Sequence, residues 1–234
     1  MKLKLTLKYT IAFLALLFVV SELHEIVHTS VGRLICGCWG ERDFNGWGLC
    51  EGCSEGSNIG LLATFSGPIF SFALMWVGYF LMADNKTLFQ KSLGFSLVFV
   101  NIPFARILTA VLGGGDEVFA LNRLLEDHTV AQIIGLLLII IICIPPCVRA
   151  FKIIQNKGKW IWFLGFFIVP TIILWLWILG VMNTLLASGV LSDYWILGSP
   201  ILITVWTIGI IILLLVTIKN LKIYEIAKEN AEGV

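Results

Sequence analysis

The chain has 234 residues, of which 59% are hydrophobic and only 13% are charged, and its formal net charge at pH 7 is +1. Soluble domains carry roughly 25% charged residues, so this composition excludes a water-facing globule and predicts a membrane protein with several spans. The small net charge and the lack of a basic run predict no nucleic-acid partner.

Six apolar stretches are long enough to cross a bilayer, which takes about 20 residues in a helix. In chain order they lie at approximately 9–35, 59–82, 92–112, 129–150, 160–183 and 195–218. Lipid cannot hydrogen-bond the backbone, so each stretch is expected to be a helix. The predicted fold class is all-α, a polytopic membrane protein of about six transmembrane helices that forms a single membrane domain over residues 1–234.

The first stretch contains the sequence SELHEIVHTS, which places His24, Glu25 and His28 within an apolar segment. Positions i and i+4 share one face of a helix, so both imidazoles can reach one metal ion. The pattern predicts one catalytic Zn²⁺, with Glu25 as the general base that activates water for attack on a carbonyl. A neutral, packed pair of histidines is the alternative, and the cost of a Glu within a span argues against it.

At these residues the chain resembles the site-2 protease family of intramembrane zinc metalloproteases. That family carries HExxH in one transmembrane helix, Gly-Pro in a later helix, and an Asp as third ligand near a Gly-rich segment that contains Pro. This chain reads HEIVH at 24–28, FSGPIFSFALM at 65–75 and NIPFARILTAVLGGGDE at 101–117, in the same order. The resemblance implies that Asp116 is the third zinc ligand.

Three details depart from the family pattern. Val27 stands before the second His, where a small residue is usual, and Ser71 follows Gly-Pro, where Asn is common. Asp116 comes after three glycines, whereas the family's Asp is usually followed by two. The resemblance therefore implies a divergent member, in which residues 1–128 form the metalloprotease-like core and 129–234 add three further transmembrane helices.

Other residues near these motifs are candidates for binding the substrate or the oxyanion of the transition state: Gly67, Pro68, Ser71 and Asn101. A Gly-Pro kink can free backbone groups for an extended substrate strand, and polar side chains can donate to an oxyanion. A simple helix kink and ordinary contacts between helices are the alternatives. Asp116 also has an alternative role, as the N-cap of a short outer helix over 116–127.

Glu22 and Arg106 are charged residues deep within predicted spans. At 1.5 Å per residue they lie ~20 Å and ~21 Å from the inner face, and this equal depth predicts an ion pair between the first and third helices. The same counting places HExxH, Gly-Pro and Asp116 in the outer half of the membrane.

Cysteines gather in the loop after the first span, at Cys36, Cys38, Cys50 and Cys53. Their spacing suits either a structural zinc or two disulfides, and the expected oxidising location favours disulfides. In both cases the loop is expected to lie over the mouth of the candidate site.

The positive charges predict the orientation of the chain. All lysines fall at one set of helix ends, whereas the opposite ends carry only Arg33, Arg42 and Arg123. By the positive-inside rule, both termini are predicted to be cytoplasmic, with the Cys-rich loop extracytoplasmic and the active site nearer the extracytoplasmic face.

Together these features predict a zinc-dependent intramembrane endopeptidase, whose substrates are membrane proteins cut in or near their transmembrane segments within the lipid bilayer. The alternatives are an inactive relative that acts as a membrane binding protein, a protease that cuts at the membrane surface, and a metal carrier. A carrier requires ionisable residues along a path across the membrane, and the stretches after residue 129 have almost none in their interiors. The sequence gives no indication of the oligomeric state.

Overall fold

The computed structural model describes residues 1–53 and 59–224. These residues form helices and three isolated β-bridges, and no strand occurs among them. Six helical segments are long and apolar enough to cross a membrane, which confirms the predicted all-α class with six spans. Lys228, one of the lysines behind the predicted orientation, lies outside the described residues.

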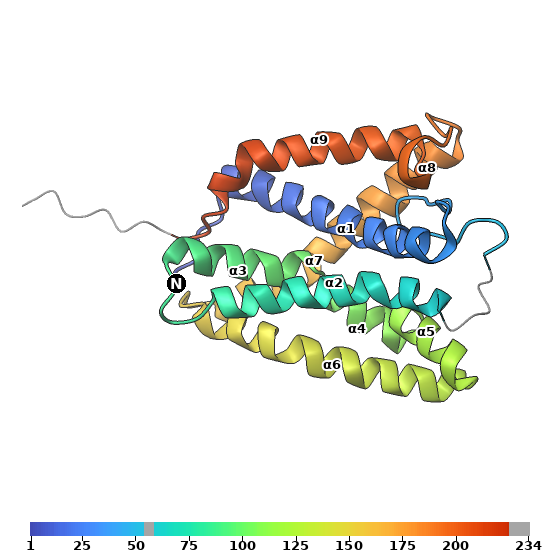
Figure 1. The fold of residues 1–234 in the computed structure, drawn as a ribbon. Coiled ribbons are helices and arrows are strands. Elements are labelled where there is room, and N and C mark those ends of the chain that lie inside the picture. The colour runs from blue at the N-terminus through green and yellow to red at the C-terminus, as the bar shows by residue number, and fades with distance from the viewer. Residues whose placement is uncertain (54–58, 225–234) are drawn as a thin grey trace, which may run out of the picture.

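Figure 1 shows the helices in chain order. The first half contains α1 (Leu7–Cys36), α2 (Gly60–Leu81), α3 (Leu88–Val100), α4 (Pro103–Val111) and α5 (Asp116–Leu125). The second half contains α6 (His128–Ile153), α7 (Lys159–Trp175), the π-helix η1 (Leu176–Met182), α8 (Asn183–Ala187), the turn η2 (Ile196–Gly198), α9 (Ile201–Thr217) and the turn η3 (Ile218–Asn220). Three spans are composite: α3 and α4 make one, α7, η1 and α8 make another, and α9 and η3 make the last.

The third span is broken between α3 and α4. Pro103 has no backbone N–H and disfavours a helical conformation at the preceding residue, and Ile102 adopts a left-handed conformation with φ 44°. Asn101 ends α3, where its Nδ2 donates to the carbonyl of Leu97 at 2.6 Å. The break gives α4 an axis of its own, so that Arg106 on α4 can approach the residues of α1.

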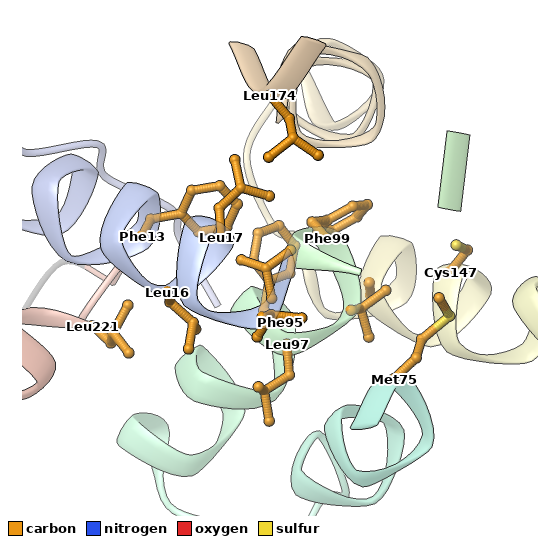
Figure 2. Close-up of a cluster of buried hydrophobic side chains, with 14 of the residues drawn as sticks. Phe13, Leu16, Leu17, Met75, Phe95, Leu97, Phe99, Cys147, Leu174 and Leu221 are labelled. Atoms are coloured by element: carbon orange, nitrogen blue, oxygen red, sulfur yellow. The ribbon is translucent and has the colours of Figure 1, made fainter. Parts of the chain in front are cut away.

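The helix α1 lies at the centre of the fold and packs against α2, α3, α7 and α9. Figure 2 shows Phe13 and Leu17 of α1 beside Phe99 of α3 in the buried core. The ring of Phe166 on α7 joins this cluster, with its centroid 5.5 Å from that of Phe13. In contrast, the apolar windows of α7 and α9 are only 22% and 17% buried, as expected for helices that face lipid.

Both described ends of the chain lie at the same end of the helices (Figure 1). The N–H of Lys4 donates to the carbonyl of Ile223 at 2.6 Å, and Leu3 forms an isolated bridge with Tyr224. An even number of spans requires this arrangement. The loop after α1 and helices α5 and α8 lie at the opposite end.

Two disulfides hold the loop after α1, which we call the Cys loop and define as residues 37–53. They join Cys36 to Cys53 and Cys38 to Cys50, with Cα atoms 5.6 Å and 6.0 Å apart. Of the two alternatives for these cysteines, the structure therefore contains the disulfides. Cys143 and Cys147, on α6, are buried and free.

Candidate metal centre

Three side chains that the sequence singles out converge at one point in the structure. His24 Nε2 lies 3.1 Å from His28 Nε2 and 3.2 Å from Asp116 Oδ2, and His28 Nε2 lies 3.5 Å from the same oxygen. Both histidines are buried, and Asp116 is partly buried. Ligands held at about 2.0–2.2 Å from a tetrahedral zinc ion are about 3.3–3.6 Å apart, so these three atoms fit three corners of such a site.

The local structure of each ligand follows from its helix. His24 and His28 lie one turn apart on α1 and therefore project from the same face. Asp116 begins α5 after a turn in which Gly113 and Gly115 have φ of +82° and +90°, a conformation that favours glycine. Gly115, and not Asp116, is the N-cap residue of α5, so the capping role considered for Asp116 is not the one it adopts.

His28 is fixed by contacts on several sides. Its Nδ1 lies 2.7 Å from the carbonyl oxygen of Ala63, which can only accept, so Nδ1 carries the proton and Nε2 keeps a free lone pair. The ring of Trp47, from the Cys loop, stacks on the imidazole with centroids 4.8 Å and planes 11° apart. Gly67 of α2 lies against the same imidazole, and a Cβ atom there would overlap its ring.

His24 has polar neighbours on its other ring nitrogen. Ser71 Oγ lies 3.0 Å from His24 Nδ1 and 3.2 Å from Arg106 Nη2, so the hydroxyl oxygen can accept from both groups. Arg106 Nη2 is itself 3.1 Å from His24 Nδ1. These contacts place Ser71 where it can orient His24, and the oxyanion contact considered from the sequence stays a prediction.

The ion pair predicted between Glu22 and Arg106 is wrong. Glu22 pairs with Arg42 of the Cys loop, with Oε2 2.9 Å from Nη2, and Arg106 pairs with Glu117 at 3.0 Å. Glu22 and Arg106 lie at equal depth, but their side chains do not point towards each other. The Cys loop folds back so that Arg42 contacts Glu22, and the positions of residues along straight helices do not predict the path of a loop. Arg106 also lies 3.8 Å from Asp116 Oδ2.

Glu25 is buried beside the triad. Among the described residues, its Oε2 has no hydrogen-bond partner. It lines two cavities that also contain Asp116, one of about 290 Å³ beneath the Cys loop and one of about 340 Å³ beside Arg106. A buried carboxylate oxygen without a partner is costly. The side chain that carries it borders the space in which a water molecule or substrate would lie.

The other candidates also lie near the triad, in different roles. The helix α2 continues through Pro68, which has no N–H to donate to the carbonyl of Thr64, and Thr64 lines the first cavity. Asn101 lines the second cavity, and its Nδ2 donates one hydrogen bond, to the carbonyl of Leu97. The amide nitrogen carries two N–H groups, so the oxyanion contact of Asn101 stays a prediction.

The formal charge of the residues around the site is negative, which favours binding of a divalent cation. Glu25, Asp116, Glu117 and Arg106 all line the second cavity, and with all four ionised their formal charge is −2. Burial acts to raise the pKa of Asp116, whereas the charge of Arg106, 3.8 Å from Asp116 Oδ2, acts to lower it. The ionised carboxylate is the form that binds a metal.

Sequence reasoning missed Arg42 and Trp47, which belong to the Cys loop. Arg42 could have been flagged only as a charge near the mouth of the site, and no pattern in the sequence points to Trp47. Their roles depend on how the loop folds back over α1.

Comparison of the chain with protein-family models, with curated proteins and with solved structures gives no match.

Proposed function

We propose that this protein is a zinc-dependent endopeptidase that hydrolyses peptide bonds in or near the transmembrane segments of other membrane proteins. The observation that carries the proposal is the mutual spacing of the His24, His28 and Asp116 ligand atoms, at 3.1–3.5 Å, with a buried and unpartnered Glu25 beside them. Zinc bound there would supply a Lewis acid that polarises a carbonyl and lowers the pKa of water towards about 7.

The residues of the chain would perform the proton transfers. Glu25 accepts a proton from water as the water oxygen adds to the scissile carbonyl carbon. The same carboxylic acid then donates this proton to the leaving amine as the C–N bond breaks, which leaves a carboxylate and an amine as products. Arg106, which lines the second cavity, is the available cationic donor to the oxyanion of the tetrahedral intermediate.

The surroundings of the second cavity support a membrane-embedded substrate. One wall carries the charged groups of the site, and another carries Leu174 and Ile178, from α7 and η1. Leu174 and Ile178 belong to a segment long and apolar enough to span a membrane, and so do Glu25 on α1 and Arg106 on α4. A transmembrane segment could therefore reach the site from the lipid, once it is unwound enough to expose its amide.

A metal carrier is the second candidate, and the distribution of candidate ligands argues against it. Among the described residues, one cluster of His, Cys, Asp or Glu has ligand spacing, and it lies near one end of the helices. A carrier would require further sites along the path. An inactive binding protein would keep the metal cluster but would have no need of an unpartnered Glu25.

The substitution Glu25→Gln tests the proposal, because it removes the base and retains the ligands and the shape of the side chain. We expect one zinc per chain in both proteins by elemental analysis, and a fall in cleavage of a transmembrane substrate by at least about 100-fold. Glu126→Gln, at an exposed acid on the same end of the molecule, is the matched control and should cleave normally. Unchanged cleavage in Glu25→Gln, or absence of zinc from the wild type, would contradict the proposal.

A further inference from the structure

A large cavity lies at the end of the helices opposite to the triad, where the described chain ends meet (Figure 1). It measures about 680 Å³ and is bordered by the end of α2, the start of α3 and the end of α6. None of its lining residues belongs to the candidate metal centre. Its chemistry therefore needs an explanation of its own.

The rim of this cavity carries positive charge without matching acids. Lys91, Arg149 and Lys152 line it, and among the described residues no carboxylate lies within ion-pair distance of these three cations. Asp84 lines the cavity as well, but there its main-chain carbonyl is what accepts from Lys91 Nζ, at 3.0 Å.

The guanidinium group of Arg149 is held in place by its neighbours but keeps N–H donors for a ligand. Its Nε donates to the carbonyl of Met82 at 3.3 Å, and its guanidinium lies 4.6 Å above the ring of Tyr79. These two contacts fix the plane of the group. Within residues 1–53 and 59–224, Nη1 and Nη2 have no hydrogen-bond partner, so they can bind an oxyanion through two parallel hydrogen bonds. A fixed guanidinium of this kind suits phosphate.

An apolar stripe leads from the cationic rim along α6. Val148 lines the cavity and is 42% exposed, and Ile144 and Ile141, on the same face of the helix, are 50% and 65% exposed. Leu88 provides a second apolar wall at the rim. The surface thus changes from cationic at the rim to apolar towards the membrane interior. A soluble phosphate would need only the cationic part, whereas a lipid would use both parts.

We propose that this cavity binds the phosphate headgroup of an anionic phospholipid. Arg149 and Lys91 contact the phosphate, Lys152 adds attraction from the rim, and one acyl chain lies along the stripe of Val148, Ile144 and Ile141. Basic pockets between transmembrane helices are suited to such headgroups, and each cation near the surface contributes to the attraction. The proposal is independent of the peptidase function.

Native mass spectrometry of the full chain in detergent tests the proposal with lipids added in known amounts. We expect dioleoyl-phosphatidylglycerol to be retained as one bound molecule and dioleoyl-phosphatidylcholine to dissociate. Glycerol phosphate, which has the headgroup chemistry but no acyl chains, should not displace the bound lipid. Equal retention of both lipids, or displacement by glycerol phosphate at similar concentration, would overturn the assignment.

Two variants locate the binding. The double substitution Lys91→Gln with Arg149→Gln should weaken retention of phosphatidylglycerol by about 25-fold, since each charge is worth about fivefold. Lys152→Gln should weaken it by about fivefold. Lys152 is exposed and has no hydrogen bond or ion pair among the described residues, so this variant keeps the test valid if the double variant does not fold.

The matched control is Lys2→Gln with Lys157→Gln, which removes two exposed charges that do not line the cavity. Its affinity for phosphatidylglycerol should equal that of the wild type. An equal loss in the control and the double variant would mean general attraction to a cationic surface, and no loss in Lys152→Gln and the double variant would mean a site elsewhere. Either result overturns the proposal.

Discussion

The orientation of His28 depends on three neighbours that come from two other segments of the chain. The carbonyl of Ala63 fixes the protonated nitrogen, Trp47 covers one face of the ring, and Gly67 allows the ring to approach α2. Such contacts hold the free nitrogen towards Asp116 before any metal is bound. A ligand oriented in advance loses little conformational freedom on metal binding, which raises the affinity of the site.

The substitution Gly67→Ala tests this packing. A Cβ at residue 67 would overlap the His28 ring, so the imidazole must move away from α2. We expect the affinity for zinc to fall by about 10- to 100-fold, as is typical when the support of a ligand is lost, with cleavage falling in parallel. Competition with a fluorescent zinc chelator measures the affinity.

Gly165→Ala on α7 is the matched control, because a Cβ there meets nothing within 4 Å. It should retain wild-type zinc affinity. If Gly67→Ala binds zinc as tightly as Gly165→Ala does, the close approach of α2 is not what orients His28.

The residues of the triad were predictable to different degrees. That His24 and His28 lie together follows from helical periodicity alone, because positions i and i+4 share a face. Asp116 came from the resemblance to a family, and the structure brings its carboxylate to the two histidines. The partner of Glu22 was not predictable, since it lies in a loop whose path is set by two disulfides and not by a helical repeat.

At the scale of elements, the Cys loop is attached to the helices by a buried ion pair. Arg42 Nη2 contacts Glu22 on α1, and Arg42 Nε donates to Ser199 Oγ at 2.6 Å. Thr207, on α9, donates a further hydrogen bond to Glu22 at 3.1 Å. This network connects α1, the Cys loop and the start of α9 next to the candidate metal centre, and it holds the loop that carries Trp47.

The substitution Arg42→Met tests the contribution of this ion pair to stability. It leaves Glu22, whose side chain is 2% exposed, without its cation, so the free energy of unfolding should fall by about 3–5 kcal/mol. The unfolding midpoint in detergent, followed by tryptophan fluorescence, measures the loss. Arg33→Met, which removes an arginine near the end of α1 without a described ion pair, should unfold close to the wild type.

The double substitution Glu22→Gln with Arg42→Met separates the ion pair from simple packing. Because it also removes the buried carboxylate, most of the lost stability should return. A double variant as unstable as Arg42→Met alone would mean that the arginine acts through its packing and its bond to Ser199.

The third span shows which features of a helix the sequence does not predict. The apolar stretch at 92–112 predicts one continuous helix, and the structure has a candidate span over Leu88–Val111 that is divided into α3 and α4. Pro103 indicates a boundary, but the left-handed conformation of Ile102 and the direction of α4 depend on packing against α6 and α7. Similarly, the π-helix η1 within the fifth span has no signal in an evenly apolar sequence.

At the scale of the whole molecule, two chemical features separate to opposite ends of the helices. The disulfides and the candidate metal centre lie towards one end, and Lys91, Arg149 and the cationic cavity lie at the other. Disulfides persist in oxidising compartments, and positive charge is retained on the cytoplasmic side. Both rules thus predict the same orientation from independent residues, with the described chain ends in the cytoplasm.

Labelling of single introduced cysteines in intact cells tests this orientation. Four native cysteines are in disulfides and the other two are buried, so a new exposed cysteine should be the main site that reacts with a membrane-impermeant maleimide. Asp193→Cys lies at the end with the Cys loop, and Lys157→Cys lies at the opposite end; both positions are exposed. We expect Asp193→Cys to be labelled in intact cells, and Lys157→Cys only after permeabilisation. The reverse pattern would place the disulfides in a reducing compartment and the lysine-rich helix ends outside, and the proposed site would then open towards the cytoplasm.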